Sequence, residues 1–181
     1  SYAGGICGHN ISGSVTGCFN FGTVRGTSSG AMALGGVCGV STGASVTGCG
    51  NLGNISGAAN GVGGVCGSLS GMQDHSYLTN SYNFGLVQSQ NANVGGICGQ
   101  SIGGDIAECY FLDTASAKGV GMQYSGSTVT KSKTTEQFAS GEVAYLLGVL
   151  FGQTIGTDTF PRRRLADDSN AVFKLTYMNG N

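Results

Sequence analysis

The chain has 181 residues, a formal net charge of −1 at pH 7, 35 glycines and a single proline. Its one basic run, Arg162 to Arg164, is too short to predict nucleic-acid binding. No segment reaches the roughly 18 to 20 apolar residues of a membrane helix. All charged residues except Arg25 and Asp74 lie at or after residue 105, so the chain has two unlike parts.

A repeated phrase organises the first part. It reads Gly-Gly-Ile-Cys-Gly or Gly-Gly-Val-Cys-Gly, and its cysteines form a first column: Cys7, Cys38, Cys66 and Cys98. The intervals between these cysteines are 31, 28 and 32 residues. Repeats of this period are typical of solenoids, in which each unit buries its apolar face by stacking on its neighbours.

Further columns keep the same register. A second cysteine column follows the first by 11, 11, 15 and 11 residues and holds Cys18, Cys49, Ser81 and Cys109. Three residues before it stands an apolar column of Val15, Val46, Leu78 and Ile106. Short apolar segments bounded by Gly, Ser, Thr and Asn indicate strands. The sequence therefore predicts an all-β fold, a right-handed parallel β-solenoid of about four rungs over residues 1–116, with units near 1–32, 33–61, 62–93 and 94–116.

A column of asparagines, each two residues before a glycine, comprises Asn20, Asn51 and Asn83. Asparagine suits tight turns and can stack its amide on the next copy, so we predict a turn with an amide ladder rather than a ligand site. The fourth unit has Phe111 in this place, which indicates that the repeat degenerates there.

After residue 116 the pattern stops, and we predict a small α+β cap over residues 117–181. Thr134 followed by Gln137 is a capping-box signature, which predicts one helix near 135–148 with a weak point at Gly141. Short strands are expected at 153–155 and 171–177. Such an element would cover the open strand edge at the end of the solenoid.

These phrases resemble a known repeat family. The glycine-cysteine phrase and the segment Val-Thr-Gly-Cys-Phe-Asn-Phe-Gly beginning at Val15 are similar to the GLUG-type repeats of bacterial surface and secreted proteins, with Ile-Cys or Val-Cys replacing Leu-Val. The segment 137–147 resembles one that follows such repeats in surface proteins of anaerobic Gram-positive gut bacteria, although Phe151 stands where Trp is expected. The resemblance implies an extracellular repeat module and no particular reaction.

The cysteines allow two structural hypotheses. They could be small buried apolar side chains filling a narrow interior. Alternatively, disulfides could staple each rung, pairing Cys7 with Cys18, Cys38 with Cys49 and Cys98 with Cys109, and leaving Cys66 opposite Ser81. A metal site is disfavoured because the columns are 11 residues apart and contain no histidine, so no metal or cofactor is expected.

The position of the first column raises a geometric difficulty. Ile6 and Cys7 are adjacent, so they would face opposite sides of a regular strand. Either the strand bends at a glycine so that both are covered, or the cysteines lie under a neighbouring loop.

No catalytic residue is predicted, because catalysis of glycan cleavage needs acidic or basic groups that converge on one groove. We expect His9 and His75 in loops. The acidic residues of the last rung should mark its solvated end; they are Asp105, Glu108 and Asp113. A calcium site is disfavoured because the remaining candidates match no known loop spacing; they are Asp158, Asp167 and Asp168.

The sequence thus predicts a non-catalytic, extracellular or cell-surface, structural or adhesive module. It begins inside a repeat phrase, so we interpret it as an excerpt of a larger bacterial surface protein. Its expected partners are adjacent repeats, other copies of the chain, and a host or glycan surface. Two alternatives stay open: a filament subunit that stacks end to end through solenoid edges, and a glycan-active β-helix enzyme fragment.

Overall fold

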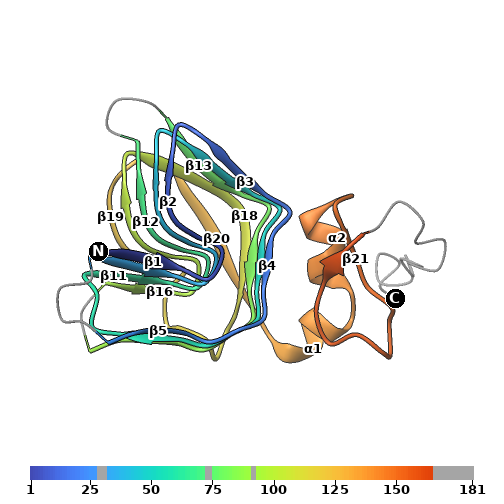
Figure 1. The fold of residues 1–181 in the computed structure, drawn as a ribbon. Coiled ribbons are helices and arrows are strands. Elements are labelled where there is room, and N and C mark those ends of the chain that lie inside the picture. The colour runs from blue at the N-terminus through green and yellow to red at the C-terminus, as the bar shows by residue number, and fades with distance from the viewer. Residues whose placement is uncertain (28–31, 72–74, 91–92, 165–181) are drawn as a thin grey trace.

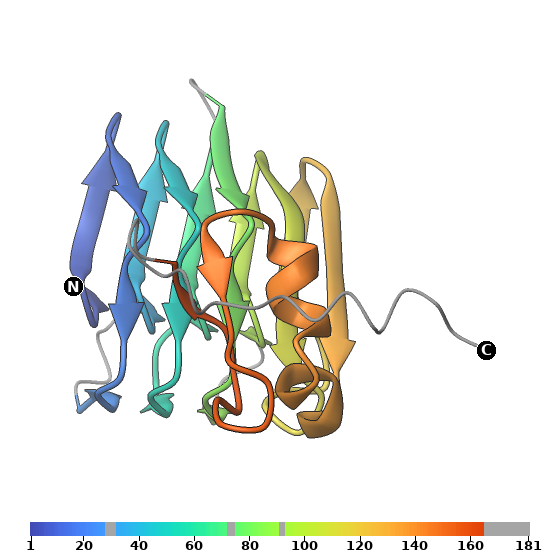
Figure 2. The ribbon, with the colours of Figure 1, turned by 90° about the vertical axis from the view of Figure 1, so that its right-hand side faces the viewer.

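The computed structural model describes residues 1–27, 32–71, 75–90 and 93–164. Figure 1 looks along a β-solenoid whose successive turns superimpose, and Figure 2 shows the same turns side by side. All strand pairs between turns are parallel. The predicted fold class, a parallel β-solenoid, is confirmed, and two short helices follow it in the chain.

Parallel sheets run along the stack, each taking one strand per rung. Sheet one contains β1 (Tyr2–Gly4), β6 (Ala33–Gly35), β11 (Gly61–Gly63) and β16 (Val94–Gly95). Sheet two contains β2 (Cys7–Ile11), β7 (Cys38–Thr42), β12 (Cys66–Ser70), β17 (Cys98–Ile102) and β19 (Val120–Ser125).

Sheet three is the largest and bends once. Its upper part contains β3 (Ser14–Thr16), β8 (Ser45–Thr47), β13 (Ser76–Thr79), β18 (Gly104–Leu112) and β20 (Thr128–Lys133). Its lower part contains β4 (Phe19–Asn20), β9 (Gly50–Asn51) and β14 (Tyr82–Asn83), and joins the upper part through β18. Sheet four contains β5 (Val24–Gly26), β10 (Ile55–Gly57) and β15 (Val87–Gln88).

The sequence columns are the registers of these sheets. Cys38 pairs with Cys7 on one side and Cys66 on the other. Asn51 likewise pairs with Asn20 and Asn83. Because the same residue type recurs at these positions in successive rungs, like side chains lie next to one another along the stack.

The solenoid extends beyond the predicted boundary at residue 116. Strand β19 pairs with β17, and β20 pairs with β18, so residues 120–133 add a fifth, partial rung. This rung lacks the glycine-cysteine phrase: Val120 occupies the column of Cys98, and Thr130 that of Cys109. The sequence signal therefore ends one rung before the structure does.

A bend at the repeated phrase covers both of its apolar residues. Val37 and Cys38 are each fully buried in the same core cluster, although they are adjacent. The backbone amides of Ile6 and Cys7 both donate to the carbonyl oxygen of Val37, which marks a corner instead of a regular strand. Of the two arrangements expected for this position, the bend at a glycine is the one present.

Glycines at this corner are required by close approach of neighbouring backbone. A Cβ atom on Gly36 would lie 2.1 Å from the carbonyl oxygen of Gly64 and 2.3 Å from Cγ of Asn51. A Cβ atom on Gly39 would lie 2.5 Å from the carbonyl oxygen of Gly8 and 2.8 Å from the amide nitrogen of Ala3. The phrase therefore records a steric constraint on how sheets one and two meet.

The C-terminal helices lie beside the stack and do not cover its end, contrary to the predicted position. Residues 134–164, which we call the C-terminal strap, pack along the outer face of sheet three (Figures 1 and 2). Arg163 donates to the carbonyl oxygen of Gly17 in the first rung, and Lys133 pairs with Glu142 beside the last. Within the described chain, the strands at both axial ends thus keep an unpaired edge.

The strap also differs from the predicted single helix. Two short helices occur, α1 (Thr135–Ala139) and α2 (Glu142–Leu147), separated at Gly141, whose φ of 85° is left-handed. The capping box of Thr134 and Gln137 is present. In place of a strand at 153–155, β21 (Phe151–Gly152) pairs antiparallel with β22 (Arg162–Arg163). The strand expected at 171–177 lies outside the described residues, and no described helix is long and apolar enough to cross a membrane.

The corner predicts a position-dependent effect of one substitution. We expect Gly39→Ala to lower the unfolding free energy by about 3 kcal/mol or more, because the new methyl group would meet backbone atoms that cannot move independently. Gly8→Ala is the matched control: it occupies the same column in the first rung, where the nearest atom to its Cβ is the Tyr2 oxygen at 3.3 Å. Urea denaturation should show a loss below about 1 kcal/mol for Gly8→Ala; equal losses would contradict the steric explanation.

Candidate functional site

The described surface has a groove of about 640 Å³ between sheets one and two. We call it the axial groove. The two sheets diverge from the glycine corner, so the groove opens on the side of the solenoid away from the strap (Figure 1). Its lining spans five rungs, from His9 on β2 to Tyr124 on β19. At about 4.8 Å per rung, this corresponds to a length of roughly 19 Å.

Sheet two supplies most of the groove wall. The position two residues after each phrase cysteine forms one row: His9, Val40, Ser68 and Gln100. The next outward position supplies Thr42, Ser70 and Ile102. The opposite wall consists of Tyr2 and Ala33 with the residues that precede three strands, Met32, Asn60 and Asn93. Hydroxyls, amides and apolar groups therefore alternate along the groove.

Polar contacts fix several of these side chains. The Tyr2 and His9 rings meet edge to face with centroids 5.0 Å apart. Nε2 of His9 lies 3.2 Å from the hydroxyl oxygen of Thr42. Nε2 of Gln100 donates to the carbonyl oxygen of Asn60 at 2.9 Å, which bridges the two walls. His9 thus lies on strand β2 and not in the predicted loop.

Acidic side chains, lysine and arginine are absent from the described lining of the groove. None of the lining residues that the structure describes is Asp, Glu, Lys or Arg. Aromatic side chains stand at both ends, with Tyr2 40% exposed in the first rung and Tyr124 66% exposed in the last. The groove therefore offers hydrogen-bonding groups and ring faces without a charge that would select an ionic ligand.

The charged candidates from the sequence do not converge. Asp105 accepts hydrogen bonds from the backbone amide and hydroxyl of Ser127, which lower its pKa. Glu108 accepts from the Tyr110 hydroxyl. His75 precedes β13, as expected for a loop, and its ring stacks on Tyr77.

Of the three candidate calcium ligands, Asp158 is the one that lies within the described residues. Asp158 is engaged by Arg162 and by the amide of Thr154. Asp167 and Asp168 lie outside the described residues. Asp113 lies in the turn after β18. Across the described ranges, no three His, Cys, Asp or Glu residues are grouped so as to hold a metal ion.

The asparagine column forms a buried amide ladder. Nδ2 of Asn20 donates to Oδ1 of Asn51 at 2.8 Å, and Nδ2 of Asn51 donates to Oδ1 of Asn83 at 2.7 Å. Each Nδ2 also donates to the carbonyl oxygen of the glycine two residues later, which fixes the turn. The side-chain amides bond to one another and to the turn backbone, as expected for a structural column. In the fourth rung the Phe111 ring occupies the place of the amide beside Gly96.

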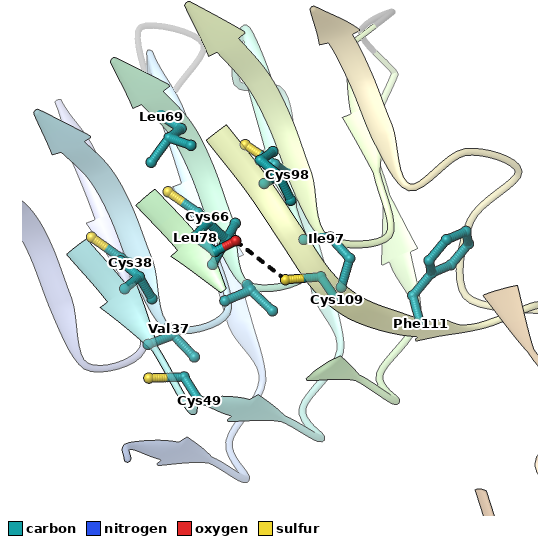
Figure 3. Close-up of a cluster of buried hydrophobic side chains, with 13 residues drawn as sticks. Val37, Cys38, Cys49, Cys66, Leu69, Leu78, Ile97, Cys98, Cys109 and Phe111 are labelled. Carbon is teal, nitrogen blue, oxygen red and sulfur yellow. Dashed lines mark hydrogen bonds between the residues drawn. The ribbon is translucent and has the colours of Figure 1, made fainter. Parts of the chain in front are cut away.

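All seven cysteines carry free thiols, and five are buried. The first column lies within the core cluster between sheets two and three, and the thiols of Cys38, Cys66 and Cys98 point the same way (Figure 3). Each donates to the carbonyl oxygen two residues later, at 3.1 to 3.2 Å. In the second column, Cys49 and Cys109 donate instead to carbonyl oxygens two residues earlier.

Burial shifts the acidity of these thiols. Desolvation raises the pKa of Cys49 to about 11 and that of Cys109 to about 12. The pKa of Cys38 is raised first by its hydrogen bond with Cys66 and then by burial. The raised pKa values keep the thiols of Cys38, Cys49 and Cys109 protonated at ordinary pH, which makes these three slow nucleophiles.

Two sets of structurally important residues were not predicted from the sequence. The groove row differs at every rung, so it does not register as a column. An outward aromatic set, Phe19, Tyr82 and Tyr110, packs beneath the strap and is interrupted by Gly50. Gly50 leaves room for the rings of Phe19 and Tyr82, and Phe151 of the strap lies 5.9 Å from each. Aromatic residues directly after the second cysteine column were the available signal.

The amide ladder predicts a large cost for one buried substitution. Asn51→Ala removes a side chain bonded to Asn83 and Gly53 and leaves Asn20 without its acceptor. We expect the unfolding free energy to fall by about 2 to 4 kcal/mol, since buried polar groups lose their partners. Asn54→Ala is the control, because Asn54 is exposed and accepts one bond from the Leu86 amide. Losses of similar size in chemical denaturation would refute a special role for the ladder.

The raised pKa of Cys49 predicts alkaline destabilisation. The folded state keeps this thiol protonated up to a pKa of about 11, whereas the unfolded state ionises near 9.0. The stabilising contribution is therefore complete below pH 9 and is lost as the pH rises towards 11, by about 2 to 3 kcal/mol.

Cys49→Ser should remove that part of the pH dependence, since serine does not ionise. Serine is already present in the column as Ser81, whose hydroxyl donates to the carbonyl oxygen of Thr79. The measurement is denaturation under reducing conditions at about pH 8 and about pH 11. If the difference in unfolding free energy between wild type and Cys49→Ser were the same at both pH values, the raised pKa assigned to Cys49 would be wrong.

Neither the scan of protein-family models nor the search of curated proteins found a match. Among solved structures, the chain is similar to the crystal structure of a "putative immunoglobulin A1 protease" from Bacteroides ovatus, with a TM-score of 0.63 and 22% sequence identity. The match covers 90% of this chain and 53% of that chain, so this chain spans about half the length of the structure it matches. At this identity, the likeness shows the fold alone.

Proposed function

We propose that the chain is a non-catalytic, extracellular binding module whose axial groove holds an uncharged, hydroxyl-rich chain, that is, a neutral glycan. The observation that carries the proposal is a groove lined along five rungs by hydroxyls, amides and terminal tyrosines, with no Asp, Glu, Lys or Arg among its described lining residues. Sugar hydroxyls both donate and accept, and their apolar faces pack on aromatic rings, so this lining suits them. The similarity to GLUG-type repeats supports the extracellular location.

Other classes of ligand fit the groove less well. A peptide commonly adds to a sheet as a further strand, which requires an unpaired strand edge. The groove walls instead present side chains from strands paired on both sides, such as β7 and β12. An acidic or basic polymer would find no opposite charge. A neutral glycan needs neither an edge nor a charge.

Proteolysis and glycan cleavage are ranked below binding. In the groove, the arrangement closest to a nucleophile and base is Thr42 with His9, at 3.2 Å. A hydroxyl nucleophile needs its base oriented by a third group. In the part of the chain that the structure describes, the polar contact of His9 is with Thr42 and its ring packs on Tyr2, so an orienting carboxylate is lacking.

A filament subunit is the second candidate, and the exposed first rung favours it. Ile6 is 48% exposed, whereas Val37 and Val65 in the same column are fully buried. The fifth rung opposes end-to-end stacking, because its edge strand β20 carries Lys131 and Lys133, and edge lysines disfavour strand pairing. We therefore rank assembly below binding.

Filling the groove should abolish glycan binding. We expect the chain to bind linear, neutral oligosaccharides on an immobilised array, and Ser68→Trp to weaken that binding at least tenfold, because Ser68 lies midway along the wall. Ser14→Trp is the matched control, a serine exposed on β3 outside the groove, and should bind like wild type. The mass of the oligosaccharide should be unchanged after incubation.

The outcomes separate the candidate functions. Equal binding by both tryptophan variants would place the ligand elsewhere, and a preference for acidic glycans would contradict the uncharged groove. If incubation with the wild-type chain produced shortened oligosaccharides and incubation with the His9→Ala variant did not, the enzymatic alternative would be established.

A further inference from the structure

The first cysteine column forms a continuous row of thiols along the solenoid. Cys7, Cys38, Cys66 and Cys98 pair in register on adjacent strands β2, β7, β12 and β17. Neighbouring parallel strands are about 4.8 Å apart, which falls within the Cα separation of roughly 4.4 to 6.8 Å that a disulfide requires. Neighbours in this column therefore meet the first geometric condition for cross-linking without movement of the backbone.

The side chains of the column share one orientation. The sulfurs of Cys38, Cys66 and Cys98 lie in a row on the same side of their strands (Figure 3). Among the cysteines that raise the pKa of Cys38 and Cys66 are thiols of the next rung, Cys66 for Cys38 and Cys98 for Cys66. The thiols of this column therefore neighbour one another between rungs, along the stack axis. The predicted staples would instead have run within a rung.

The second column is interrupted. Cys18 and Cys49 occupy successive rungs, Ser81 takes the third place, and Cys109 takes the fourth. Cys49 donates to the carbonyl oxygens of Thr47 and Val15, which keeps it beside the rung of Cys18. Ser81 mimics the cysteines, since its hydroxyl donates to the carbonyl oxygen two residues earlier just as their thiols do. Cys109 consequently has no thiol in the adjacent rung of its column.

We propose that the thiol columns are a site of oxidative modification, at which inter-rung disulfides form between Cys7 and Cys38, Cys66 and Cys98, and Cys18 and Cys49. Cys109 stays a free thiol. If Cys38 paired with Cys66, the thiols of Cys7 and Cys98 would have no neighbouring partner in the first column. The proposed pairing uses all four cysteines of that column. The odd number of cysteines then follows from Ser81, which removes the partner of Cys109.

The oxidant is a low-molecular-weight disulfide such as oxidised glutathione. The thiolate of half-buried Cys7 attacks one glutathione sulfur and expels one glutathione thiolate. The thiolate of Cys38 then attacks the Cys7 sulfur of the mixed disulfide and expels the second. Two protein thiols become one disulfide, and the oxidant is reduced to two glutathione thiols that take up the released protons.

Cys66 and Cys98 are fully buried, so they are reached by exchange along the column: Cys66 attacks the Cys38 sulfur and expels Cys7, and Cys98 then attacks the Cys66 sulfur and expels Cys38. The freed Cys7 and Cys38 thiols react with a second molecule of the oxidant, and half-buried Cys18 is the point of entry for its pair with Cys49.

Mass spectrometry distinguishes this pairing from the within-rung pairing by the identity of the free cysteine. The folded chain is incubated with oxidised glutathione, acid-quenched, alkylated with N-ethylmaleimide and digested with pepsin. The expected products are peptides linking Cys7 to Cys38, Cys66 to Cys98 and Cys18 to Cys49, with the alkyl group on Cys109. Links within rungs with the alkyl group on Cys66, or no linked peptides at all, would overturn the proposal.

Ser81→Cys provides an independent test that keeps all seven native cysteines. It completes the second column, so a fourth link between residues 81 and 109 should appear and no cysteine should remain alkylated. Cys109→Ser is the matched control and should retain the three links of wild type. An oxidised Ser81→Cys chain that still carries an alkylated Cys109 would contradict pairing along the column.

Discussion

The structure depends on how tightly sheets one and two meet at the glycine corner. At Gly36 and Gly39, backbone atoms of neighbouring strands occupy the space that a side chain would need. The same contact holds the amide of Asn51, which lies against Gly36 and bonds to the asparagines above and below. Because this arrangement fits only when each rung sits directly over the next, it fixes the register of the stack.

Register then explains why like residues meet. In an array held in register, each column becomes a row of identical side chains one strand spacing apart. For asparagine this yields a satisfied amide ladder, and for cysteine it yields adjacent thiols. The strap supplements the register from outside, since its contacts extend from Gly17 in the first rung to Lys133 at the end of the fifth.

The repeat phrase and its columns were sufficient to predict the solenoid and its first four rungs. They did not reveal the fifth rung, because Val120 and Thr130 preserve the strand positions without preserving the cysteines. Nor could they place the strap: its docking surface depends on Tyr82 and Phe19 closing over Gly50, a relation between rungs that no single repeat displays. The direction of the cysteine contacts was hidden for the same reason, since chain spacing suggests partners within a rung while strand spacing favours partners between rungs.

The comparison of repeats within the chain separates scaffold from binding surface. Each of the first four strands of sheet two presents, in order, a core thiol, a glycine packed on sheet one, and a residue that faces the axial groove. The first two positions are the same in four rungs, whereas the third changes from His9 to Val40, Ser68 and Gln100. Packing at the corner dictates the constant positions, but nothing in the core constrains the variable one. A groove whose wall changes at each rung can discriminate the units of a bound chain, which a uniform ladder of side chains could not do.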